Sequence, residues 1–195
     1  MQNSISPQLL EKVQDLAVPL AASLGLEIWG LELSGGVHPV LRVFANLASE
    51  AEPKMPEELN GRSVDVESLA SLSRMLSLGL EVEDLFHDAW TLEISSPGLE
   101  RPFFRLEQLK NYLNKIIEVN LLEPVESDPI RKKYIGCLTE VRDCSFSLLL
   151  DLPGTELDGT TLEIIWSLVK KAHLVHIFDN PQKPGRQQPN QKHGA

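Results

Sequence analysis

The stretch from Leu92 to Pro102 restricts the path of the backbone more than any other part of this chain. Apolar and polar residues alternate in its first half, which is the two-residue period of a strand with one buried face. Pro97 then sets φ near the value needed at the second position of a β-turn. Gly98 can take the positive φ needed at the third position of a type II turn. We therefore predict a strand that leads into a turn over residues 96–99.

A structural boundary is expected directly after this turn. Pro102 has no backbone N–H to donate, and it restrains Arg101 to an extended conformation. The strand therefore cannot continue unchanged into the next segment. The residues expected to shape this motif are Ser96, Pro97, Gly98, Leu99 and Pro102.

The chain begins with a predicted helix. Ser6 and Pro7 suit a helix N-terminus, and apolar residues then recur every three or four positions. Pro19 interrupts this stripe, so we expect a kink or a break near Val18. Gly25 is expected to end the helix.

Two strands and a second helix follow. Strands are predicted over residues 26–33 and 40–47, with a bulge near Gly30 where the alternation changes phase. Residues 48–62 are acidic and contain two prolines, which indicates an exposed loop. Asp65 is the expected cap of the second helix. The residues expected on its buried face are Val66, Leu69, Leu72, Leu76 and Leu80. With the strand before Pro97, these elements predict an α+β unit of order helix, strand, strand, helix, strand, whose three-stranded sheet has both helices on one face.

After the boundary the period changes. A short helix is predicted over residues 106–113, followed by several short alternating strands, the last over 172–178. Turn residues separate these strands, which favours a small all-β barrel. Residues 180–195 are polar and rich in Pro, Gln and Gly, so we expect a disordered tail. The predicted domains are residues 1–102, residues 103–179 and the tail 180–195.

Charge is distributed unevenly over the chain. The formal net charge is −10. Residues 1–102 contain 6 basic and 16 acidic side chains, whereas residues 103–195 contain 12 of each. Contact with a nucleic acid must therefore come from local basic patches. The acidic first half suits a basic protein partner instead.

At the turn motif the chain resembles a known family. The sequence LEISSPGLERPF, from Leu92 to Phe103, is similar to the signature of the bacterial ribosome maturation factor RimP family, and the resemblance extends from about Leu9 to Phe178. It implies that the second domain is an SH3-like or Sm-like barrel. It also implies binding to the immature small (30S) ribosomal subunit, with contacts to ribosomal RNA and to a basic small-subunit ribosomal protein near the decoding centre.

Neither catalysis nor metal binding is indicated. His173 and His176 are three positions apart, which places them on opposite faces of a strand, and ligands of suitable spacing do not accompany them. Ser95 and Ser96 precede a proline turn and not a nucleophile elbow. We therefore expect no catalytic residue, no metal and no cofactor. We also expect no membrane-spanning segment, a cytoplasmic location and a monomer.

Two basic clusters are the candidate binding residues. The candidates are Arg131, Lys132 and Lys133, Lys170 and Lys171, together with Arg101 near the boundary. They could contact ribosomal RNA phosphates. The alternative is that they only protect sheet edges from aggregation.

The sequence leaves three functions open. The first is a non-catalytic ribosome assembly factor. The second is a protein-only adaptor whose barrel binds a peptide without RNA contact. The third is an enzyme of unrecognised type. The element order of the first domain also resembles K-homology RNA-binding modules, but the glycine-bracketed loop that grips RNA in those modules is missing.

Overall fold

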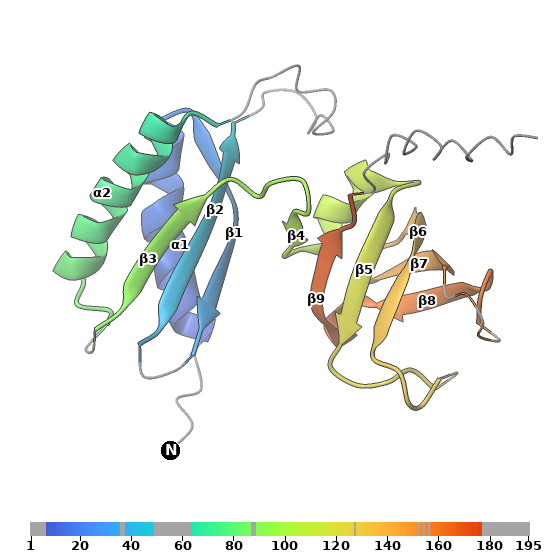
Figure 1. Ribbon diagram of the computed structural model, residues 1–195. Coiled ribbons are helices and arrows are strands. Elements are labelled where there is room, and N and C mark those ends of the chain that lie inside the picture. The colour runs from blue at the N-terminus through green and yellow to red at the C-terminus, as the bar shows by residue number, and fades with distance from the viewer. Residues whose placement is uncertain are drawn as a thin grey trace, which may run out of the picture.

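The structure is a computed structural model, and Figure 1 shows its elements. It describes residues 7–35, 38–48, 64–86, 89–126, 128–151, 153, 155 and 157–176. The predicted loop after Ala48, the predicted tail 180–195, and the last two residues of the predicted strand 172–178 lie outside these ranges. In the described residues we find no helix with both the length and the apolar character needed to cross a membrane.

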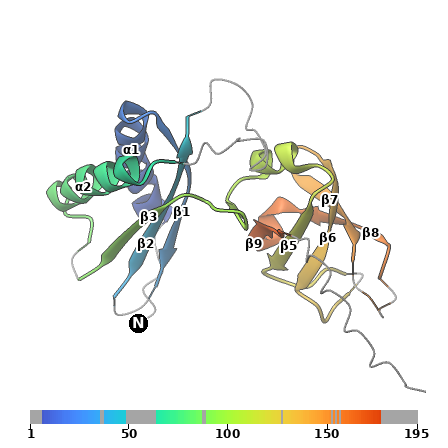
Figure 2. The same ribbon diagram turned by 45° about the horizontal axis from the view of Figure 1, so that its top comes forward.

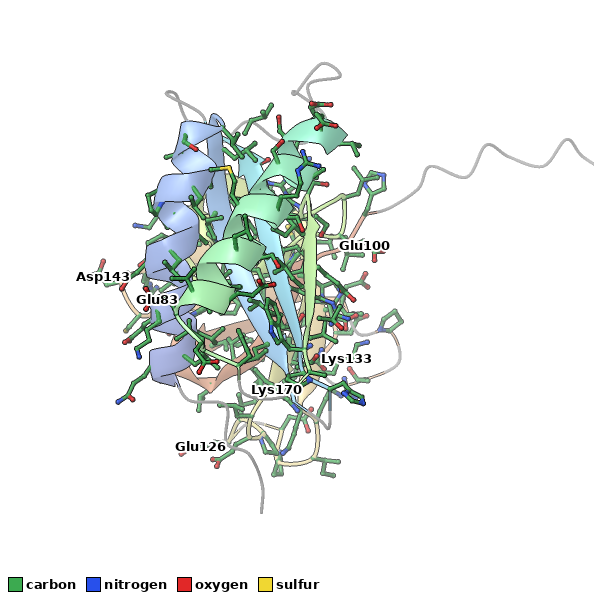
Figure 3. All side chains as sticks on the ribbon, turned by 90° about the vertical axis from the view of Figure 1, so that its left-hand side faces the viewer. Glu83, Glu100, Glu126, Lys133, Asp143 and Lys170 are labelled. Carbon is green, nitrogen blue, oxygen red and sulfur yellow. The ribbon has the colours of Figure 1, made fainter. Side chains whose placement is uncertain are left out.

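The first part of the chain consists of a three-stranded sheet and two helices. Its elements are α1 (Pro7–Ser23), β1 (Leu26–Ser34), β2 (Val40–Leu47), α2 (Val66–Val82) and β3 (Thr91–Ser95). The sheet order is β1-β2-β3, with β1 antiparallel and β3 parallel to β2. Helix α2 makes the crossover that a parallel pair requires. Both helices lie on one face of the sheet, as predicted (Figure 3).

We predicted a kink or a break near Val18; helix α1 continues through Pro19, so a break does not occur there. The helix buries Val13, Ala17 and Ala21, one residue in each successive turn. Pro19 and Asp15 are exposed. The Asp15 carbonyl, which loses its usual helical donor at Pro19, therefore faces solvent that can hydrogen-bond to it.

Helix α2 begins at the predicted cap. The Ser68 N–H donates to Asp65 Oδ2 at 3.3 Å. Val66 is 78% exposed, which corrects the prediction that it is buried. Val64, the residue before the cap, is buried instead and lies in one cluster with Leu69. This is the hydrophobic staple arrangement, and it supplies the apolar contact predicted for Val66.

The second part is an antiparallel sheet of six strands. Its order is β4-β9-β5-β6-β7-β8. The strands are β4 (Pro102–Phe103), β5 (Ile116–Leu121), β6 (Lys133–Val141), β7 (Ser145–Leu150), β8 (Thr161–Ile165) and β9 (Val169–Leu174). Two short 3-10 helices accompany them, η1 (Leu106–Tyr112) and η2 (Trp166–Leu168). Trp166 is the first residue of η2.

We predicted a closed barrel, but the strand pairing leaves the second sheet with two edges. Within the described residues, β4 pairs only with β9 and β8 pairs only with β7, so these two strands are the edges of the sheet. The helix η1 contributes Leu106, Leu109 and Tyr112 to the apolar core on this sheet. The apolar side chains of η1 thus cover a part of the core that the open sheet alone would leave exposed.

The two sheets have largely separate apolar cores. Two clusters lie between the first sheet and its helices, and a third lies on the second sheet. Trp29 of β1 is the exception, because it is buried in the third cluster, and Phe44 of β2 packs against the same cluster. Figure 2 shows the two sheets apart, joined by the chain that leads from β3 to β4.

Candidate nucleic-acid interface

The turn motif has the expected glycine conformation. Gly98 has a φ of 70°, in the left-handed region that glycine adopts without strain. The turn itself falls at Leu99 and Glu100, later than the predicted 96–99. Pro97 is buried, whereas Ser96 is exposed. Pro102 starts β4 and pairs with His173, so the chain enters the second sheet directly after Arg101.

Arg101 lies inside the protein. The residue is 4% exposed, and its Nη1 donates to Tyr112 Oη at 2.8 Å. Its Cζ is 4.9 Å from the centre of the Trp29 ring and 5.9 Å from that of Tyr112. Two aromatic faces thus offset part of the cost of burying the guanidinium. This burial corrects the expectation that Arg101 offers its charge to a partner at the surface.

Trp29 and Gln108 connect the two sheets by hydrogen bonds. The β1–β2 register shifts between Ile28 and Gly30, which confirms the predicted bulge and leaves Trp29 without a strand partner. The free Trp29 carbonyl accepts from Gln108 Nε2 at 2.7 Å, and Trp29 Nε1 donates to the Pro102 carbonyl at 2.7 Å. The bulge therefore supplies the groups that bind the second sheet.

Gly30 leaves room for an aromatic ring. A Cβ placed on Gly30 would lie 1.9 Å from Phe104 Cδ2. The Phe104 ring also packs on Phe44, with 5.5 Å between ring centres. Sequence reasoning missed this contact and the role of Gln108. We refer to Trp29, Gly30, Arg101, Phe104 and Gln108 as the junction.

Strand register brings the two basic clusters together. Asn120 of β5 pairs with Lys133 of β6 on one side and with Lys171 of β9 on the other. Side chains of directly paired residues point to the same face, so these three side chains form one row across three strands. The alternating residues Val119 and Tyr134 are buried on the other face.

The other candidates lie at the same end of the sheet. The Lys132 carbonyl accepts from the Leu121 N–H at 2.7 Å, which fixes the chain before β6 against the end of β5. Lys170 is skipped by the register shift between β5 and β9 and is exposed. Figure 3 labels Lys133 and Lys170. We call this surface the basic end, comprising Arg131, Lys132, Lys133, Lys170 and Lys171.

Several charges at the basic end are already paired. Arg131 Nε lies 3.6 Å from Asp128 Oδ2, and Lys133 Nζ lies 2.8 Å from Glu118 Oε1. Lys132 Nζ donates to the Leu122 carbonyl at 2.8 Å. Lys170 has no such partner within the part of the chain that the structure describes.

Lys171 is paired with the other sheet. Its Nζ donates to Glu32 Oε1 of β1 at 2.5 Å. The partly exposed pairs at the basic end are weak interactions, because water and salt screen them.

Aromatic stacking and metal binding find no support at this surface. Tyr134 is fully buried, and burial, with Asp128 nearby, raises the pKa of its phenol. His173 Nε2 lies 3.9 Å from Glu118 Oε1, a carboxylate contact that the sequence did not suggest. Among the described side chains, we find no group of three potential ligands that could hold a metal ion.

A shallow pocket lies elsewhere on the second sheet. Its volume is about 380 Å³, and its lining includes Phe104, Leu106, Ile165 and Trp166. Ile165 is 51% exposed, so an apolar side chain from a partner could pack there. Glu107 and Asp143 are at the same pocket.

Comparison with known proteins identifies the family. A family model described as the RimP N-terminal domain matches residues 16–100. The protein named ribosome maturation factor RimP from Lawsonia intracellularis is 41% identical over 181 residues, which cover 91% of this chain and 92% of that protein. The protein of the same name from Nitratidesulfovibrio vulgaris is 41% identical over 176 residues, which cover 89% of this chain and 95% of that protein. A more distant protein of this name, from Desulfovibrio desulfuricans, is 33% identical over a region that covers 91% of this chain and 84% of that protein. The family suggested by the motif at Leu92–Phe103 is confirmed, and the chain belongs to the ribosome maturation factor RimP family.

Proposed function

We propose that this protein is a ribosome maturation factor that binds the immature small (30S) ribosomal subunit and assists its assembly without catalysing a covalent reaction. Family membership carries this proposal, because the relatives that match nine-tenths of the chain are named for a role in ribosome maturation. The site of action would be the cytoplasm, and the protein would act as a monomer.

The basic end is the proposed contact with ribosomal RNA. Its support is the strand register that gathers Lys133 and Lys171 around Asn120. Lysine binds phosphate as a point charge and does not read bases, so this contact would position the factor on RNA without sequence recognition. The acidic first half, including the exposed Glu81, Glu83 and Asp84, would face a basic small-subunit ribosomal protein near the decoding centre.

The proposed architecture has two working units, residues 1–102 and 103–179. The support for this division is the separate apolar cores on the two sheets. β4 begins at Pro102, next to the proposed boundary. We further propose that the second unit acts as a small SH3-like or Sm-like barrel, with η1 covering the space between its edge strands β4 and β8.

The mechanism we propose is differential affinity. A factor that binds an immature conformation more tightly than the finished subunit shifts the population between them, whereas an equal binder shifts nothing. Sedimentation of a cell extract through a density gradient should place the protein with free small subunits. Equal amounts on free small subunits and on complete ribosomes would contradict the proposal.

The shallow pocket supports a second candidate function. A protein-only adaptor would use Ile165 and Trp166 to bind an apolar side chain of a peptide, with no RNA contact. Nuclease treatment of the isolated complex separates the two candidates. An adaptor keeps its partner after RNA is digested, whereas an RNA-dependent factor is released.

A further inference from the structure

The side chain of Glu32, a residue of β1 in the first sheet, reaches the second sheet. It pairs in register with Arg42 of β2, which in turn pairs with Glu93 of β3. Arg42 Nε lies 2.7 Å from Glu93 Oε2. The carboxylate of Glu32 instead contacts Lys171 Nζ at 2.5 Å, across 139 positions of sequence.

The Glu32 carboxylate occupies a position suited to any anionic oxygen. Lys171 lies beside the Asn120 amide, with Lys133 on the next strand. An ammonium group binds carboxylate and phosphate oxygens through the same charge-assisted hydrogen bond. The first unit therefore places an oxygen anion on the row that we propose for RNA.

The contact is exposed enough to be exchanged. The side chains of Lys171 and Glu32 are 63% and 31% exposed. Exposed ion pairs contribute little to stability because water and salt screen them. A polyanion that brings several phosphates can compete with one carboxylate for such a lysine.

We infer that Glu32 is a built-in competitor for phosphate at Lys171. An RNA phosphate oxygen takes the place of the Glu32 carboxylate, and the ion pair between the two sheets breaks when RNA binds. By linkage, Glu32 weakens RNA binding by as much as RNA weakens the Glu32–Lys171 contact. This inference rests on the proposed RNA contact of the basic end.

The test compares two full-length variants that lose the same charge. Glu32→Gln removes the competing carboxylate. Glu100→Gln is the matched control, because Glu100 is an exposed acid between β3 and β4 with no described ion-pair partner. Binding of a fluorescently labelled transcript of small-subunit ribosomal RNA is measured by anisotropy at several salt concentrations, and thermal unfolding checks that both variants fold.

Glu32→Gln should bind the transcript about two- to fivefold more tightly than Glu100→Gln at low salt, the range that exposed ion pairs support. The difference should shrink as salt rises. In a Lys171→Met background, Glu32→Gln should give no advantage over Glu100→Gln.

The possible failures are distinguishable. Equal affinities of the two glutamine variants, with clear binding by the unchanged protein, would overturn the competitor role of Glu32 and leave the RNA contact standing. An advantage of Glu32→Gln that persists in the Lys171→Met background would also overturn it. No binding of the transcript by any of the proteins would overturn both the RNA contact and this inference.

Discussion

The guanidinium of Arg101 lies on the indole of Trp29, with 4.9 Å from its Cζ to the ring centre. Trp29 belongs to β1 of the first sheet, whereas Arg101 directly precedes β4 of the second. The Tyr112 hydroxyl accepts a hydrogen bond from the same guanidinium at 2.8 Å. Within the part of the chain that the structure describes, Arg101 Nε is the one buried side-chain N or O atom without a hydrogen-bond partner. Aromatic faces therefore carry much of the stabilisation of this buried charge.

Arg101→Ala should lower the free energy of unfolding by about 2 kcal/mol, because it removes the aromatic contacts and the hydrogen bond to Tyr112. Chemical denaturation measures the change. The control is Arg74→Ala, which removes an exposed arginine from α2 and should change stability by less than about 1 kcal/mol. Equal effects of the two substitutions would contradict the role of Arg101 in the junction.

Gly30→Ala should destabilise the protein by about 1–3 kcal/mol, because the new Cβ would overlap the Phe104 ring and force it to move. Gly79→Ala is the matched control. Gly79 lies within α2 with open space around its Cα, so alanine there should stabilise the protein by about 0.5–1 kcal/mol. The two melting temperatures should therefore move in opposite directions.

Gly98→Ala tests backbone conformation without a steric clash. Nothing lies within 4 Å of a Cβ added at Gly98, but its φ of 70° strains any side chain. The expected loss is about 1 kcal/mol, and Gly98→Asn should lose less because asparagine tolerates this region better. An unchanged melting temperature for Gly98→Ala would reject a constrained glycine at this turn.

Reversing charge at Lys132 and Lys133 together should weaken binding to isolated immature small subunits. It should also reduce the slope of log affinity against log salt by about 1 for each RNA phosphate that the variant no longer neutralises. Lys110→Glu, on the exposed side of η1, is the control for a charge reversal outside the basic end. If affinity and slope stay unchanged, these lysines only protect a sheet edge.

The chain has two tyrosines, Tyr112 and Tyr134, and burial raises the pKa of each above its ordinary value of 10.0. At Tyr112 the nearby Arg101 cation opposes this shift without cancelling it. The ordinary pKa of the phenol is 10.0, so the tyrosines of the unfolded chain lose their protons around this pH. The tyrosines of the folded protein lose theirs only at a higher pH. The free energy of unfolding should therefore fall as pH increases above the ordinary pKa.

Ultraviolet absorbance of phenolate provides the measurement. At pH 10, the ordinary pKa of a tyrosine phenol, the native protein should show little phenolate, and denaturant at the same pH should reveal it. Equal phenolate in the native and denatured protein would show that neither tyrosine is protected.

Local patterns were sufficient for most of the elements. The cap at Asp65, the bulge near Gly30 and the positive φ of Gly98 each depend on one or two neighbouring residues, so they could be predicted. The effect of Pro19 on the helix could not be predicted. The cost of a proline within a helix depends on whether the carbonyl that loses its donor reaches solvent, and the spacing of residues does not report this.

The junction could not be predicted in the same way. The contact of Gln108 with Trp29 joins residues 79 positions apart, and periodicity reports only local faces. The basic clusters were identified, but their convergence depends on the order β9-β5-β6, which no local pattern specifies. Arg101 was named as a candidate phosphate contact, and no local pattern shows that the fold places it against Trp29 and Tyr112.

The position of β9 within its sheet bears on synthesis of the chain. Translation can complete the first sheet once Ser95 has left the exit tunnel, since β1, β2 and β3 precede that point. The second sheet has β9 between β4 and β5. The pairings of β9 with β4 and with β5 therefore cannot form until Leu174 emerges. Folding is thus expected to proceed in two stages from the N-terminal side, with the row of Lys133, Asn120 and Lys171 assembled last.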